Sequence, residues 1–220
     1  MFARQSSKLL LLSLCVILGG CATSRSEIKL QSPVASAATS AAVNGRVVVI
    51  RSISDDRVFE QAPSDPSTPS LGFGGSDRAT AAVKARAIGR KRNGFGKALG
   101  DVLLENGQTV EDVVRTNLTV ALQQAGYQVK TEAGLSANPL VLDVRIKQFW
   151  AWFRPGFWAI TLSSNIATEL YVTGVSAPLE ITTHTEENRQ MATEGAWMEI
   201  VQKGLTDYRA QVAAKMNGRF

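Results

Sequence analysis

Two segments of the chain repeat apolar residues at helical spacing. The first begins at Thr109 and ends at Gly126, and Thr109 with Asp112 resembles a capping box. Its apolar stripe consists of Val110, Val114, Leu118, Ala121, Leu122 and Ala125. The second covers about 194–215, and its stripe consists of Trp197, Val201, Leu205, Tyr208 and Val212. The pattern therefore predicts two amphipathic helices.

Other segments alternate apolar and polar residues, as strands with one buried face do. Residues 142–146 and 158–172 alternate in this way on either side of the turn Arg154-Pro155-Gly156, and 179–187 follows as a third strand. Two such runs joined by a short Pro-Gly turn predict an antiparallel hairpin. A run of β-branched residues at 46–50 predicts one further, buried strand.

This order of elements is typical of an α+β domain. We expect a largely antiparallel sheet of about four strands, with two main helices packed on one face. A long loop is predicted at about 55–108, although alanines at 79–82 favour a short helix and 102–104 is expected to pack on the core. Residues 21–44 are rich in Ser, Ala and Thr and predict a flexible, disordered tether, so that 45–220 forms a single domain.

The first 20 residues have the pattern of a secretory signal peptide. A basic start precedes the apolar run 9–18, which is shorter than the roughly 20 apolar residues of a membrane-spanning helix. The run ends as Leu18-Gly19-Gly20-Cys21, which resembles a bacterial lipobox and marks Cys21 for lipid attachment. The alternative is an ordinary signal peptide with a chance cysteine. Ala22 stands where an inner-membrane retention signal would have Asp, so resemblance to diderm lipoproteins implies the outer membrane of a Gram-negative bacterium, facing the periplasm.

Composition argues against several classes of function. Without Arg4 and Lys8 of the signal peptide, 22 basic and 19 acidic residues remain, and the net charge falls from +5 to 22 − 19 = +3. Such a weak charge does not indicate a nucleic-acid-binding protein. Cys15 leaves with the signal peptide, Cys21 carries lipid and His184 is the only histidine, so no His/Cys metal site can be assembled. We therefore expect no metal, no cofactor and no enzymatic activity, with His184 on the solvent side of its strand.

Two groups of residues are candidate contact sites. A basic cluster, interleaved with glycines and Phe95, could bind an anionic partner or could simply be a solvated loop; it consists of Arg86, Arg90, Lys91, Arg92 and Lys97. Strand alternation divides the aromatic residues of the hairpin into a buried class, Trp150, Trp152 and Trp158, and a candidate partner surface, Phe149, Phe153 and Phe157. Alternatively the last helix and the long loop cover both faces. A bulge near Pro155 would shift the register and interchange the two classes.

The whole layout resembles the YajG-like family of bacterial lipoproteins. The resemblance rests on the lipobox, the first strand, the helix ending Gly126-Tyr127-Gln128-Val129, the long alternating hairpin and the last amphipathic helix. It implies a small α+β periplasmic module on an outer-membrane anchor, with no known chemistry. The expected function is that of a non-enzymatic adapter or accessory subunit of an envelope assembly, with an envelope protein as partner. The alternative is a lipid- or glycan-binding module with a pocket under the aromatic hairpin.

The lipobox interpretation predicts the effect of removing the thiol. Cys21→Ala should block acylation, so that unprocessed precursor accumulates because cleavage follows lipidation. Mass spectrometry of the N-terminal peptide and fractionation of the envelope measure this. Normal maturation of the variant, together with sedimentation in the outer-membrane fraction, would contradict the interpretation.

Overall fold

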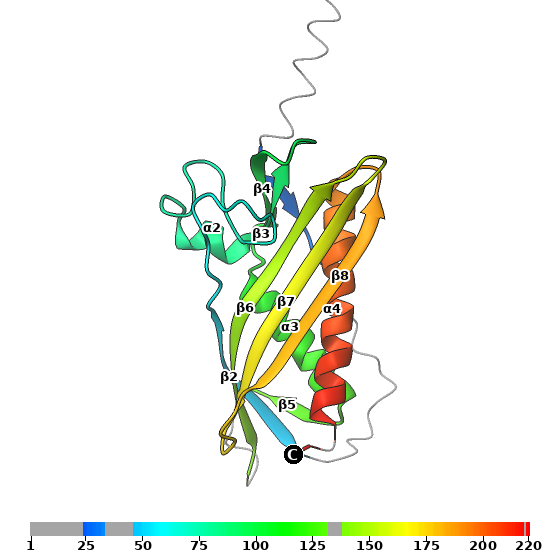
Figure 1. Ribbon diagram of the computed structural model, residues 1–220. Coiled ribbons are helices and arrows are strands. Elements are labelled where there is room, and N and C mark those ends of the chain that lie inside the picture. Colours follow the sequence, from blue (N-terminus) through cyan, green and yellow to red (C-terminus); the bar gives the residue numbers. More distant parts are fainter. Residues whose placement is uncertain (1–23, 34–45, 132–137, 218) are drawn as a thin grey trace, which may run out of the picture.

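A computed structural model of the chain describes residues 24–33, 46–131, 138–217 and 219–220 (Figure 1). One eight-stranded sheet runs through the molecule, and its three longest strands form an antiparallel meander. These strands are β6 (Leu140–Pro155), β7 (Ile160–Val172) and β8 (Leu179–Arg189). Among the helices of the described residues, none is both long enough and apolar enough to cross a membrane.

The other side of β6 is paired with two strands that lie end to end. β2 (Val47–Asp55) pairs in parallel with the first part of β6, and β3 (Ala87–Arg92) pairs in parallel with its second part. β5 (Gln128–Lys130) extends the sheet beyond β2. Beyond β3, β4 (Ala98–Leu104) is antiparallel, and β1 (Ser26–Ile28) pairs in parallel with β4. The sheet is therefore mixed.

The prediction of a largely antiparallel sheet of about four strands was wrong. β1 lies in the segment predicted as a tether, and β3 and β4 lie in the predicted loop at 55–108. These strands and β5 are only three to seven residues long. So few positions cannot establish an alternation. In addition, β1 pairs with β4 and β3 pairs with β6 across long stretches of sequence, which leaves no local signal for those pairings.

The predicted helices are confirmed. α3 (Val110–Gln124) begins at the N-cap Thr109, whose hydroxyl accepts a hydrogen bond from the Asp112 amide at 3.2 Å. α4 (Glu194–Met216) and α3 lie on one face of the sheet, with both predicted apolar stripes buried. The short helix expected near the alanines is α2 (Ala81–Arg86). The described part of the chain thus has three helices.

A bulge in β6 decides which aromatic residues face α3 and α4. The register against β7 shifts between Ile146 and Gln148. Before the shift, even-numbered residues such as Ile146 enter the core under the helices; after it, Phe149 and Phe153 do. Side chains alternate with a period of two, so one extra residue turns all the following ones to the opposite face.

The bulge corrects the assignment of the hairpin aromatics. Phe149 and Phe153 are buried in the main core and are not a partner surface. Trp150 and Trp152 lie in a second core, where they pack with Leu71, Ala87 and Leu103 and with residues of α2 and the loop before it. Trp158, predicted to be core, is 84% exposed, whereas Phe157 is 90% exposed as expected.

Truncation of two hairpin aromatics tests this register. Phe153→Ala should lower the free energy of unfolding by about 3–5 kcal/mol, because a large buried side chain leaves a cavity. Trp158→Ala should change it by less than about 0.5 kcal/mol, because the ring is exposed. Urea unfolding followed by circular dichroism compares the two variants with the parent. If Trp158→Ala were the more destabilising of the two, the side chains would alternate along β6 without a bulge, and the register described above would be wrong.

Candidate functional site

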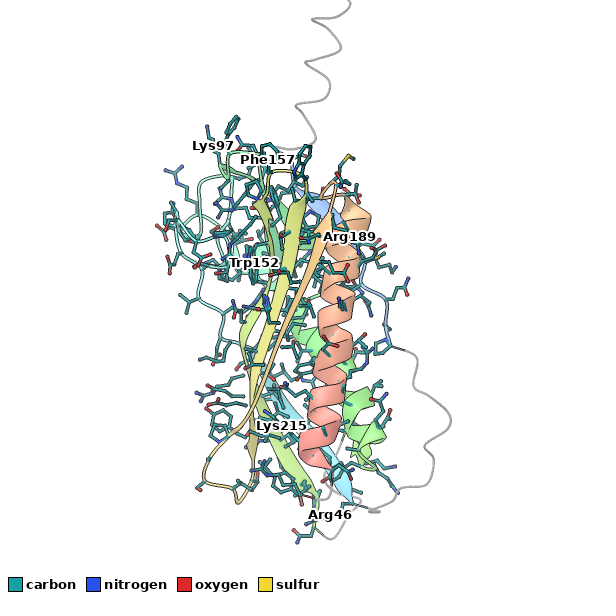
Figure 2. All side chains as sticks on the ribbon, turned by 45° about the vertical axis from the view of Figure 1, so that its right-hand side comes forward. Arg46, Lys97, Trp152, Phe157, Arg189 and Lys215 are labelled. Carbon is teal, nitrogen blue, oxygen red and sulfur yellow. The ribbon has the colours of Figure 1, made fainter. Side chains whose placement is uncertain are left out.

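The candidate site is a cleft of about 560 Å³ at the end of the molecule where Ser24 enters the fold. We call it the N-terminal cleft. Its walls come from the start of β1, the end of β3, the β6–β7 hairpin and the connection between β8 and α4. Lys97 and Phe157 lie at this end of the molecule, and Arg46 and Lys215 lie at the opposite end (Figure 2).

The apolar part of the cleft is closely packed. Trp197 of α4 and Phe153 of β6 line it, with ring centroids 6.3 Å apart in an edge-to-face arrangement. Gly89 of β3 permits this packing, because a Cβ there would lie 2.8 Å from the Ala151 carbonyl oxygen and 3.3 Å from the Trp197 ring. The absence of a side chain at Gly89 therefore lets β3 and the indole approach the same stretch of β6.

Basic side chains line the opposite wall. Lys91 donates to the Ser24 carbonyl at 3.1 Å, Arg92 donates to the Gly96 carbonyl at 2.9 Å, and Arg25 pairs with Asp101 at 3.1 Å. Burial lowers the pKa of Arg92 from its ordinary value, and the charge of a nearby arginine lowers it further. A cation that has lost part of its hydration attracts an anion more strongly than one in bulk water. One acidic residue, Glu194, also lines the cleft.

The predicted basic cluster does not form one surface. Arg86 donates twice to the Leu104 carbonyl, at 2.9 and 2.7 Å, and pairs with Glu27 of β1. Arg90 is partly buried and donates to the Leu99 carbonyl at 3.4 Å. These contacts give Arg86 and Arg90 structural roles. Lys91 and Arg92 line the cleft and Lys97 is exposed; anion binding by these three stays a prediction.

Exposed apolar side chains surround the cleft, and the sequence patterns did not identify most of them. Phe95, in the turn between β3 and β4, is 98% exposed, and Met191, which lines the cleft, is 66% exposed. Trp158 and Phe157 project from the turn between β6 and β7. Turn residues could have identified these exposed side chains. Asn-Gly precedes Phe95 and Pro-Gly precedes Phe157, and such pairs favour turns, in which the alternation of a strand no longer applies. Cys21 lies outside the described residues.

The described residues offer little for metal chemistry. They contain no group of three or more His, Cys, Asp and Glu side chains that could hold a metal ion. His184 is on the exposed side of β8, as predicted, and its Nδ1 lies 2.6 Å from the Asn165 side-chain oxygen. What the N-terminal cleft combines is an apolar, aromatic surface with cations, which suits a ligand that carries both an apolar part and an anionic group.

Comparisons with known proteins give no family. No family model matches the chain, and no curated protein matches it. Among solved structures, one described as an uncharacterized protein has a TM-score of 0.43 at 12% identity, covering 88% of this chain and 98% of its own. A Xanthomonas campestris protein assigned to the family model DUF330 has a TM-score of 0.41 at 7% identity, covering 90% of this chain and 98% of its own.

Two glycines of the same hairpin test the packing of the cleft. Gly89→Ala should lower the free energy of unfolding by about 1–3 kcal/mol, because the new methyl group overlaps the Ala151 carbonyl oxygen. Gly94→Ala should be nearly neutral, because a Cβ there meets nothing within 4 Å. Thermal unfolding of the two variants measures the difference. Equal stability of both would show that β3 is not held against β6 at this point.

Proposed function

We propose that the chain is an outer-membrane lipoprotein, anchored through Cys21 and facing the periplasm, and that its domain is a non-enzymatic adapter or accessory subunit of an envelope assembly. Membership of the YajG-like family, which the sequence resembles, is part of this proposal. The observation that carries the adapter role is the outer edge of β8, a long edge strand whose one partner among the described strands is β7.

The start of the fold supports an anchor close to the domain. Ser24 is the third residue after Cys21, and a peptide chain spans at most about 3.3–3.6 Å per residue, or about 10 Å over these three steps. A lipid on Cys21 would therefore hold the N-terminal cleft near the bilayer. β7 has 13 residues and extends about 43 Å at about 3.3 Å per residue, so the sheet reaches well away from that end.

One half of the β8 edge is covered by α4. The Gln211 side chain accepts from the Thr182 amide at 2.8 Å and donates to the Thr182 carbonyl at 3.0 Å, and Lys215 donates to the Glu180 carbonyl at 2.6 Å. In an antiparallel pair, the residues of an edge strand alternate between bonding to the partner strand and pointing their N–H and C=O groups away from it. After Glu180 and Thr182, the next residues of β8 whose backbone groups point away from β7 are therefore His184 and Glu186.

We call the other half of the edge the open half, because the described side chains of α4 bond there to side chains of β8 and not to its outward backbone groups. The side-chain contacts are the ion pairs of Lys203 with Glu187 at 2.7 Å and of Arg189 with Glu199 at 2.9 Å. Within the described residues, no α4 side chain bonds to the outward backbone groups of His184 or Glu186. An extended segment of a partner protein could add to the sheet there, with main-chain hydrogen bonds supplying the affinity. This half of β8 is the one nearer to the N-terminal cleft, because β8 ends at Arg189 just before the residues that line it.

A second candidate function is the binding of a lipid or a glycan. The N-terminal cleft favours it, because about 560 Å³ falls within the usual range of about 300–1,000 Å³ for ligand pockets. Phe153 and Trp197 supply an apolar surface, and Lys91 and Arg92 supply positive charge. A lipid with an anionic head group fits this combination.

Proline substitutions on β8 test the adapter role. Glu186→Pro removes an outward amide of the open half, and an edge strand tolerates proline where its N–H faces away from the sheet. A photo-crosslinking residue at position 184 in intact cells should capture a discrete protein partner, and Glu186→Pro should abolish this product. The matched control is Glu180→Pro, which has the same residue type and the same parity but lies in the half that α4 covers.

The outcomes separate the two candidate functions. Loss of the crosslink in Glu186→Pro alone, at unchanged protein level, supports the adapter. If the crosslink persists, or if the detergent-extracted protein contains one lipid per chain and no protein partner, the adapter proposal is wrong. In the second case, lipid binding in the cleft takes its place.

A further inference from the structure

We infer that the end of the molecule around the N-terminal cleft is a membrane-contact surface. Phe95, Phe157, Trp158 and Met191 insert into the interfacial region of the same leaflet that holds the lipid on Cys21, so the domain stands end-on on the bilayer. This inference rests on the proposed anchor and adds a second, non-covalent contact to it.

The first of two turns at this end holds Phe95 in solvent. The Asn93 side-chain oxygen accepts hydrogen bonds from the amides of Phe95, at 3.0 Å, and Lys97, at 2.9 Å. The Asn93 amide donates to the Lys97 carbonyl at 2.9 Å, and Gly96 takes a positive φ of 79°. The exposure of Phe95 is therefore built into a closed, hydrogen-bonded turn.

The second turn projects two adjacent aromatic rings. A Cβ on Gly156 would lie 2.5 Å from the Ala159 carbonyl oxygen, so this tight turn after Pro155 requires glycine. Phe157 and Trp158 pack edge-to-face with centroids 4.8 Å apart, and both remain almost fully exposed. They contact each other, while the core residues of β6 and β7 begin at Phe153 and Leu162.

Two separate turns thus present large aromatic side chains at one end of the domain, close to Met191. Exposed apolar side chains that cluster in this way mark an interaction site, because a soluble surface rarely leaves them in contact with water. Tryptophan is enriched at the membrane–water interface, where its ring is buried and its N–H remains hydrated.

Two observations identify a bilayer as the occupant of this surface. The chain leading to Cys21 leaves the fold here, because Ser24 lines the same cleft as Met191, and only about 10 Å of extended chain separates Ser24 from Cys21. Positive charge also lies at this end, with Lys97 exposed two residues from Phe95 and Lys91 and Arg92 in the cleft. Such charges attract acidic lipid head groups.

Tryptophan fluorescence tests the inference, because Trp158 is the exposed member of the four tryptophans and the other three are buried. The full-length lipidated protein is reconstituted into vesicles of phosphatidylethanolamine and phosphatidylglycerol, with or without brominated acyl chains. Amphipathic elements insert about 5–10 Å into the boundary between head groups and acyl chains. Bromine near the head-group end of the chain should therefore quench Trp158 more strongly than bromine near the chain terminus.

Two variants serve as controls. Trp158→Phe should remove the quenched component and keep the fluorescence of the buried rings. The double variant Trp158→Phe with Val175→Trp has its exposed tryptophan in the turn between β7 and β8, at the opposite end of the sheet. Bromine should not quench the fluorescence of this tryptophan. Quenching at both positions would mean that the domain lies flat, and the end-on contact would be wrong.

Failure of the inference and failure of the anchor are distinguishable. Mass spectrometry of the N-terminal peptide reports acylation of Cys21 independently of the fluorescence. If Cys21 is acylated, the vesicles carry the protein and Trp158 is still not quenched, the membrane-contact surface is wrong while the anchor stands. If Cys21 carries no lipid, the proposed anchor is wrong. In that case the inference also falls, unless the protein without lipid binds the vesicles and Trp158 is quenched.

Discussion

The guanidinium of Arg57 fills a gap in the backbone pairing along one side of β6. The gap lies between the end of the pairing with β2, at Ile146, and the pairing with β3, at Ala151. The Arg57 side chain is fully buried and forms a bidentate pair with Asp55 at 2.7 Å. It also donates to the carbonyls of Ala87, Phe149 and Lys84 at 2.6, 3.0 and 2.8 Å. One cation therefore satisfies acceptors from β3, β6 and α2 at once. Loss of such a buried charge network is among the most destabilising changes a fold can undergo.

Both cores of the molecule depend on this junction. β3 reaches β6 only beyond the gap, at Gly89 and Ala151, and with β4 it widens the sheet at the end where the N-terminal cleft lies. Trp150 and Trp152 are covered on the face opposite to α4 because the chain from β2 to β3 crosses there. Without that crossing, these rings would be exposed, and the wall of the cleft that carries Lys91 would be missing.

The long elements were predictable because each repeats its pattern over several turns or many alternations, as α3, α4 and β7 do. The aromatic faces of β6 were not, because a single inserted residue near Lys147 reverses the parity and leaves no mark in the composition. Cys21 could be singled out from a local motif, whereas the cleft could not, since its walls come from segments far apart in the chain. Nothing in the sequence around Arg57 distinguishes a buried arginine from an exposed one.

The short strand β1 has a mechanical consequence for an anchored protein. If Cys21 carries the proposed lipid, a force that acts through the N-terminus first meets the contacts of Ser24 with Lys91 and of Arg25 with Asp101, and then the parallel pairing of β1 with β4. Glu27 is pinned there by Arg86, and the side-chain amide of Gln108 holds both backbone groups of Leu30, at 3.1 and 2.9 Å. These contacts would distribute the force over several hydrogen bonds before the force reaches the core. The resistance of an anchored domain to such a force would therefore depend first on a few residues on β1 and its neighbours, and only secondarily on the stability of the whole domain.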